Sequence, residues 1–232
     1  MKLRPLLAFV FFIVPLRLSA VTPAREEILA ATLQPYTGPS ERGVDTSTLT
    51  GKVMCGYQGW FACEGDGGEI GNQHWTKKHG PLAPGNAKID LWPDVSELGP
   101  DERFSTGFQL ADGKPAEVFS SFKQATVLRH FRWMREYGID GAFVQRFIAS
   151  LRDANSLRMN NTVLAHCREG ANRNGRAYAV MYDLSGLGAG RIREVMERLA
   201  GAADADAHWR RSGVSAASRK AARGGVGRRV QR

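Results

Sequence analysis

The sequence lacks any apolar run of the ~20 residues that a membrane-spanning helix requires. Its longest apolar run, residues 6–16, follows Lys2 and Arg4 and precedes the small pair Ser19-Ala20. This order of basic, apolar and small residues is typical of a secretory signal peptide, and the charge of Arg17 argues against a membrane anchor. We therefore expect a signal peptide at residues 1–20, a secreted or periplasmic protein, and no stable membrane insertion after cleavage.

Core-forming side chains are missing from the other end of the chain. Residues 201–232 contain no Leu, Ile, Phe, Tyr or Met. A segment this poor in apolar side chains cannot bury a core, so we expect a disordered, basic, low-complexity tail. Codons can be chosen for residues 219–231 that, read one nucleotide later, encode an apolar segment typical of a buried strand. This motivates the hypothesis that the tail is out of frame, with the reading frame changing between Gly186 and Arg219.

Net charge is absent from the middle of the chain. The total is +9, of which residues 1–20 carry +3 and residues 201–232 carry +6. Residues 21–200 hold 21 basic and 21 acidic side chains. A domain that binds nucleic acid carries a basic face, so the neutral middle excludes nucleic acid as its partner.

Cysteine is scarce, with three in the chain. Cys55 and Cys63 can pair in an oxidising compartment, which the sequence leaves open, whereas Cys167 lies on the apolar side of a helical stretch. Together with His74 and His79, the first two also form a loose zinc pattern. Its spacing matches no standard finger and Cys55 lies within a strand-like run. We expect no metal and no cofactor.

Between residues 45 and 200, after a lead-in at 21–44, strand and helix patterns alternate. The predicted strands are 52–57, 141–147 and 177–183. The predicted helices are 124–137, 156–174 and 191–199, and a long irregular stretch runs from 65 to about 114. Apolar strands separated by helices are typical of an α/β fold with a parallel sheet and right-handed crossovers.

Two architectures use this alternation, the doubly wound sheet and the (β/α)8 TIM barrel. The loop after the first strand, residues 56–60, carries Tyr57 and Trp60 where a phosphate-binding loop needs glycine, which favours the barrel. A complete barrel takes about 250 residues. We therefore expect the N-terminal part of a TIM barrel, incomplete, with its site where the strands end.

The predicted strand ends and the loops near them are rich in aromatic, amide and charged side chains. Aromatic faces pack against the C–H face of a sugar ring, and amides, guanidinium and carboxylates bind its hydroxyls. We therefore predict a carbohydrate partner, with simple packing at the barrel mouth as the alternative for the aromatic residues. The candidate substrate-binding residues are Tyr57, Gln58, Trp60, Trp92, Asp94, Gln145, Arg146, Tyr182 and Asp183.

Four motifs add a family resemblance. Residues 52–61, 89–97, 138–147 and 179–186 resemble secreted bacterial proteins often labelled xylosidase/arabinosidase, within the glycoside hydrolase family 71/99-like group. The resemblance covers roughly residues 45–195. It implies a (β/α)8 barrel and hydrolysis of O-glycosidic bonds in a polysaccharide or glycan.

The sequence departs from this group where catalysis is concerned. A glycosidase needs two carboxyl groups flanking the scissile bond. After Asp183 the closest pair is Glu194 and Glu197, which is better explained as the solvated face of an arginine-rich helix. We expect an inactive glycosidase-like chain, with Asp183 as its one catalytic candidate. The alternatives are a non-catalytic carbohydrate-binding or non-functional barrel fragment, and a barrel completed by a second chain; the oligomeric state stays open.

Overall fold

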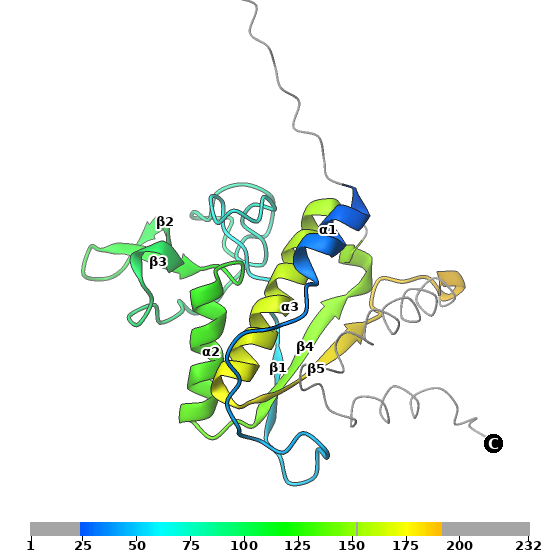
Figure 1. The fold of residues 1–232 in the computed structure, drawn as a ribbon. Helices are drawn as coiled ribbons and strands as arrows, with labels where there is room; N and C mark the ends of the chain where they lie inside the picture. The colour runs from blue at the N-terminus through cyan, green and yellow to red at the C-terminus, as the bar shows by residue number, and fades with distance from the viewer. Residues whose placement is uncertain (1–23, 152, 192–232) are drawn as a thin grey trace, which may run out of the picture.

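The computed structural model describes residues 24–151 and 153–191 of the 232-residue chain (Figure 1). The predictions of a signal peptide at 1–20 and of a disordered, out-of-frame tail at 201–232 lie outside these residues. The predicted helix at 191–199 also lies outside them from residue 192 onward.

A three-stranded parallel sheet organises the described residues. It consists of β1 (Met54–Tyr57), β4 (Gly141–Phe147) and β5 (Ala177–Asp183) in the order β1–β4–β5. The predictions of β4 and β5 are confirmed residue for residue, whereas β1 begins two residues later than expected. The mixed α/β fold with a parallel sheet is thus confirmed, but the sheet does not close into a barrel within the described residues.

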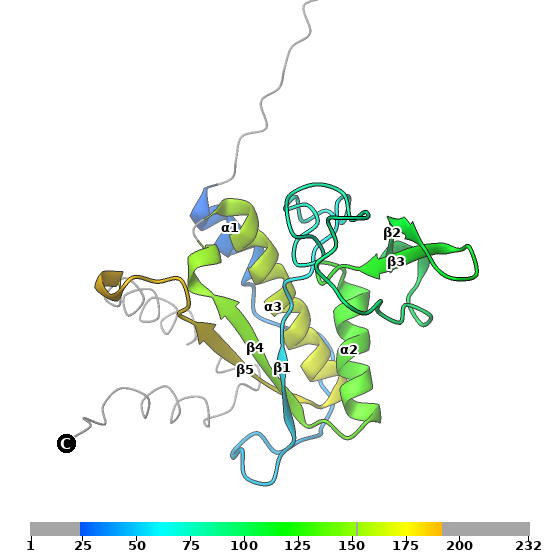
Figure 2. The ribbon, with the colours of Figure 1, turned by 180° about the vertical axis from the view of Figure 1, so that it is seen from behind.

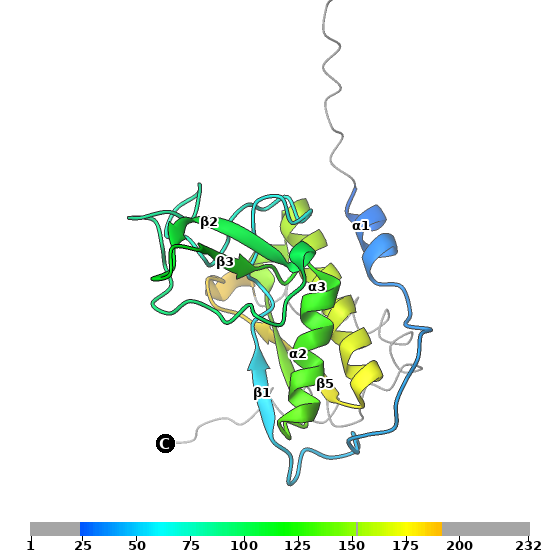
Figure 3. The ribbon, with the colours of Figure 1, turned by 90° about the vertical axis from the view of Figure 1, so that its left-hand side faces the viewer.

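Two long helices cover one face of this sheet, α2 (Gln124–Glu136) and α3 (Ala154–Asn174) (Figures 1 and 3). Both were predicted, and both end as the sequence indicates. The side chain of Asp153 caps α3 by accepting the N–H of Ser156 at 2.7 Å. Gly138 and Gly175 follow the two helices with φ of 74° and 56°, values that glycine adopts without steric cost.

The main core lies between the sheet and these helices. Val127 and Phe131 of α2 are both 0 % exposed and pack with Val144, Val163 and Leu164. Gly170 lets the two helices approach closely, because a Cβ there would lie 2.8 Å from the Phe131 ring. An alanine at position 170 would therefore push α3 away from α2.

An antiparallel hairpin that the sequence reading missed follows the long loop after β1. It consists of β2 (Arg103–Gln109) and β3 (Pro115–Phe119), preceded by the short 3-10 helix η1 (Pro100–Glu102). The prediction of irregular structure up to about residue 114 is therefore wrong for β2. Its apolar alternation is interrupted by Thr106 and Gly107, and the pairing shifts register between Ser105 and Gln109.

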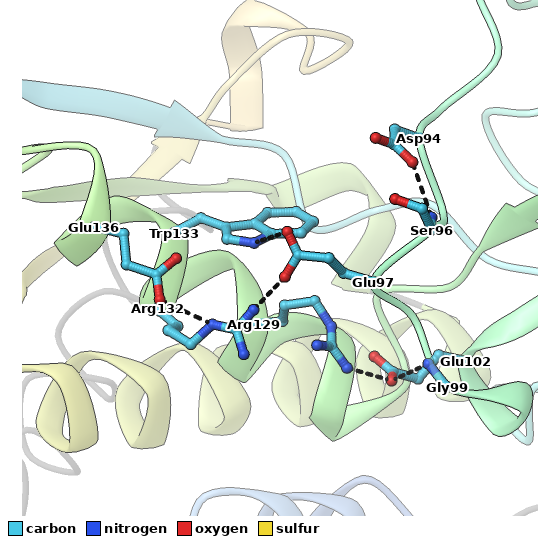
Figure 4. Close-up of polar contacts among 9 residues, drawn as sticks. All are labelled: Asp94, Ser96, Glu97, Gly99, Glu102, Arg129, Arg132, Trp133 and Glu136. Atoms are coloured by element: carbon cyan, nitrogen blue, oxygen red, sulfur yellow. Dashed lines mark hydrogen bonds and ion pairs between the residues drawn. The ribbon is translucent and has the colours of Figure 1, made fainter.

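A buried ion pair fastens the base of this hairpin to α2 (Figure 4). Glu102 accepts hydrogen bonds from Arg129 at 2.7 Å, from Thr126 at 3.0 Å and from the N–H of Gly99 at 2.8 Å. Burial alone would raise the pKa of Glu102, but these hydrogen bonds outweigh it and hold the pKa below its ordinary value. The carboxylate is thus ionised and fully paired.

The lead-in runs along the outer side of α3 (Figure 3). Its helix α1 (Arg25–Thr32) buries Ile28 against Leu157 and against Leu151 of the 3-10 helix η2 (Ile148–Leu151). Another short 3-10 helix, η3 (Ala189–Arg191), ends the described residues. Within residues 24–151 and 153–191, no helix combines the length and apolarity that crossing a bilayer demands.

A half-buried histidine lies where the sheet, the hairpin and α2 meet. His130 Nδ1 lies 2.9 Å from the hydroxyl of Tyr57, and its ring contacts Phe119 and Trp133. Burial lowers the pKa of His130 to about 4, with Glu102 opposing the shift and Arg129 adding to it. The imidazole is therefore neutral at pH 7.

Protonation of His130 is expected to destabilise the fold. Its pKa falls from 6.5 to about 4 on folding, so the unfolded chain binds the proton first as the pH drops below 6.5. Between pH 7 and pH 5 this group should remove about 1 to 2 kcal/mol from the free energy of unfolding. Urea unfolding of the wild type and of His130→Gln at pH 7 and pH 5 measures this loss in the free energy of unfolding. Equal pH dependence in the two proteins contradicts the expectation.

A second prediction concerns the contribution of the Glu102–Arg129 ion pair to stability. Arg129→Met leaves the Glu102 carboxylate buried without its counter-charge, which should cost about 3 kcal/mol in urea unfolding. Arg132→Met is the matched control, because Arg132 pairs with Glu97 on the exposed side of the same helix and should cost under about 1 kcal/mol. The expectation is wrong if the two variants are equally stable.

Candidate functional site

Three polar side chains from separate strands meet where the parallel strands end. Gln58 follows β1, Gln145 lies in β4 and Asp183 ends β5. Gln58 Nε2 donates to Gln145 Oε1 at 3.3 Å, and Gln145 Nε2 donates to Asp183 Oδ2 at 2.5 Å. We call these residues the polar row. It lies on the sheet face opposite the helices, the face that Figure 2 presents.

The negative charge of Asp183 fixes the donor and acceptor direction of the hydrogen bonds along the polar row. Hydrogen bonds from the side chain and the N–H of Ser185, and then from Gln145, hold the pKa of Asp183 below its ordinary value. The ionised carboxylate only accepts hydrogen bonds, so the Gln145 amide must turn its Nε2 toward it. Its Oε1 then faces Gln58, whose own amide is oriented in turn.

An aromatic group adjoins the polar row. The Trp60 ring stacks on Phe147 with centroids 5.2 Å apart and on His74 with centroids 4.5 Å apart. Phe147 pairs in register with Asp183 and shares the sheet face of Gln145. We call Trp60, His74 and Phe147 the aromatic stack. Burial lowers the pKa of His74, with a further contribution from Lys88, so its ring is neutral at pH 7.

Three other candidates point to the helix side of the sheet. Tyr57 is 8 % exposed beside His130, Arg146 bonds Asn161 of α3, and Tyr182 packs against the cluster of Ile28, Leu151 and Leu157. Successive side chains of a strand alternate between its faces, so these neighbours of Gln58, Gln145 and Asp183 face away from the row. The structure does not bring them together with it.

Trp92 and Asp94 lie in the loop that leads to η1. The Trp92 ring packs edge-on against Phe108 of β2 with centroids 5.3 Å apart. Asp94 accepts the N–H of Ser96 at 2.9 Å, a bond that lowers the pKa of Asp94 (Figure 4). Their contacts are with the hairpin and their own loop, so they are not part of the polar row.

The cysteines are all free thiols in the structure. Cys63 is buried and its Sγ lies 3.3 Å from the carbonyl of Phe119, which it bonds, while Cys55 lies in β1. Burial raises the pKa of Cys63, which keeps it protonated. Residues 24–151 and 153–191 hold no group of three or more His, Cys, Asp or Glu side chains arranged to bind a metal ion.

Two members of the aromatic stack, His74 and Phe147, were not among the predicted binding residues. His74 was considered as part of a loose zinc pattern. Phe147 was included in the predicted strand at 141–147 but was not singled out. The signal was present, because residues two apart in a strand share a face and Phe147 follows Gln145 by two.

Comparisons with known proteins add little to this geometry. No family model matches the chain, and no curated protein matches it. Among solved structures, the GH99 endo-alpha-mannosidase from Bacteroides thetaiotaomicron is similar, with a TM-score of 0.34 and 20 % sequence identity. The match covers 65 % of this chain and 39 % of that enzyme, so this chain corresponds to well under half of it. A likeness this loose carries no argument about activity.

Proposed function

We propose that the polar row and the aromatic stack together bind carbohydrate. The observation that carries the proposal is their adjacency: Phe147 of the stack lies beside Asp183 of the row in the β4–β5 register. A sugar presents an apolar C–H face and a rim of hydroxyls, so it needs an aromatic surface next to hydrogen-bonding groups. The resemblance of residues 45–195 to the xylosidase/arabinosidase-labelled proteins supports a polysaccharide or glycan ligand.

The row offers a defined set of bonds to such a ligand. Asp183 is ionised, and its oxygens accept hydrogen bonds from sugar hydroxyls as well as from Gln145 and Ser185. Asp183 orients the Gln145 amide, which in turn orients the Gln58 amide. Gln58 Oε1 is therefore the acceptor at the end of the row farthest from Asp183. The ligand would lie along the sheet edge, with its ring against the aromatic stack.

Binding without turnover is the activity that this site supports. The polar row contains one carboxylate, whereas glycoside hydrolysis takes two. The lowered pKa of Asp183 also means that it holds no proton to donate, so it does not suit the role of general acid. We further propose that the sheet is the first part of a (β/α)8 barrel, since β1 and β5 each pair on one side only among the described residues.

Trp60→Ala tests carbohydrate binding. Loss of the stacking surface should weaken the affinity for the preferred oligosaccharide about tenfold. Titration calorimetry with xylo-, arabino- and manno-oligosaccharides gives the measurement. Trp133→Phe is the matched control, because Trp133 lies on α2 and bonds Glu97. The proposal fails if none of these sugars binds the wild type, or if Trp60→Ala binds as tightly as the control.

Hydrolysis should be absent. The purified chain is expected to release no chromophore from aryl xylosides, arabinosides or mannosides beyond the rate in buffer alone. Turnover by the wild type that Asp183→Asn abolishes would show that Asp183 is catalytic and that the proposal of binding alone is wrong.

A further inference from the structure

A buried positive charge lies behind the polar row. Arg146, the neighbour of Gln145 in β4, is 5 % exposed, and Asn161 of α3 is 1 % exposed. The two are joined by a hydrogen bond from Arg146 Nη2 to Asn161 Oδ1. An arginine stays protonated at any physiological pH, so a full charge is enclosed between the sheet and α3.

Nothing around Arg146 in the described residues balances this charge. Burial lowers the pKa of Arg146, and the ionisable groups close enough to oppose that shift are the phenol of Tyr182 and the thiol of Cys167. Phenols and thiols are neutral at pH 7, and burial raises the pKa of Cys167 further. The guanidinium therefore faces neutral groups, in contrast to Arg129, which is paired with Glu102.

Each of these two side chains also has a hydrogen-bond donor without an acceptor. Arg146 Nε and Asn161 Nδ2 are both buried and bond no group in the part of the chain that the structure describes. Because the two side chains are bonded to each other, these donors belong to one cluster. Buried donors and buried charges are rarely left unsatisfied in folded proteins, since both are costly.

We propose that Arg146 and Asn161 bind a small monovalent anion, with chloride as the physiological ligand. An anion accepts from both donors and neutralises the guanidinium, whereas a water molecule satisfies the donors but leaves the charge unbalanced. Both side chains are almost fully enclosed, which favours a single-atom anion over phosphate or a carboxylate ligand. The site would join β4 to α3 immediately behind Gln145, and it does not depend on carbohydrate binding.

Thermal melting of the full chain in two salts tests the proposal. Sodium gluconate replaces sodium chloride at constant ionic strength, because gluconate is too large for an enclosed site. The melting temperature should rise with the logarithm of the chloride concentration once that concentration exceeds Kd, and the rise should be about 4 °C at a tenfold excess over Kd. Bromide should act as chloride does. Identical melting in chloride and gluconate overturns the proposal.

A variant that places a carboxylate in the proposed anion site is a sharper test. Asn161→Asp is nearly isosteric and supplies Arg146 with its own counter-charge, so it should melt higher in gluconate and lose the chloride response. Arg132→Gln removes an exposed arginine and should keep that response. Broadening of the ³⁵Cl NMR line by wild-type protein, reversed by bromide, is a readout that needs no variant. A chloride response retained by Asn161→Asp, or no line broadening, contradicts the assignment.

Discussion

The register of three parallel strands decides where every side chain near the site can point. Gly141 pairs with Met54 on one side and with Ala177 on the other, so the strands advance in step and end at a common edge. From that register, alternation sends Gln145 and Asp183 to the open face and Arg146 and Tyr182 to the helices. Polar contacts on one face and packing on the other are thus two results of one backbone arrangement.

Strands and helices with strong local signals were predictable from the sequence. β4 and β5 are short strands that begin with apolar residues, at 142–144 and 177–181, and Gly138 and Gly175 follow α2 and α3. The hairpin was not recognised, although Asp112-Gly113 between two short runs is a usual hairpin turn. Its alternation is irregular, and its position depends on the distant pair of Glu102 and Arg129.

The site was predictable only in part, for a physical reason. Strand ends could be located from the sequence, and the amide, carboxylate and aromatic residues there were recognised. The face of each side chain follows from pairing register, which a single sequence does not display. Tyr57 and Tyr182 therefore looked equivalent to Gln58 and Asp183, yet lie on the other side of the sheet. Loop contacts, such as the stacking of His74 on Trp60, depend on tertiary structure.

The lead-in acts as a strap along α3, attached at both ends. Arg25 Nη1 bonds the carbonyl of Leu151 at 2.9 Å near the start of α3, and the N–H of Val44 bonds the carbonyl of Gly175 at 2.9 Å just past its end. The helix is therefore covered by the sheet, by α2 and by this strap, and it buries residues such as Met159, Cys167 and Ala171. Tolerance to substitution should consequently be lower along α3 than along α2, whose outer side faces solvent.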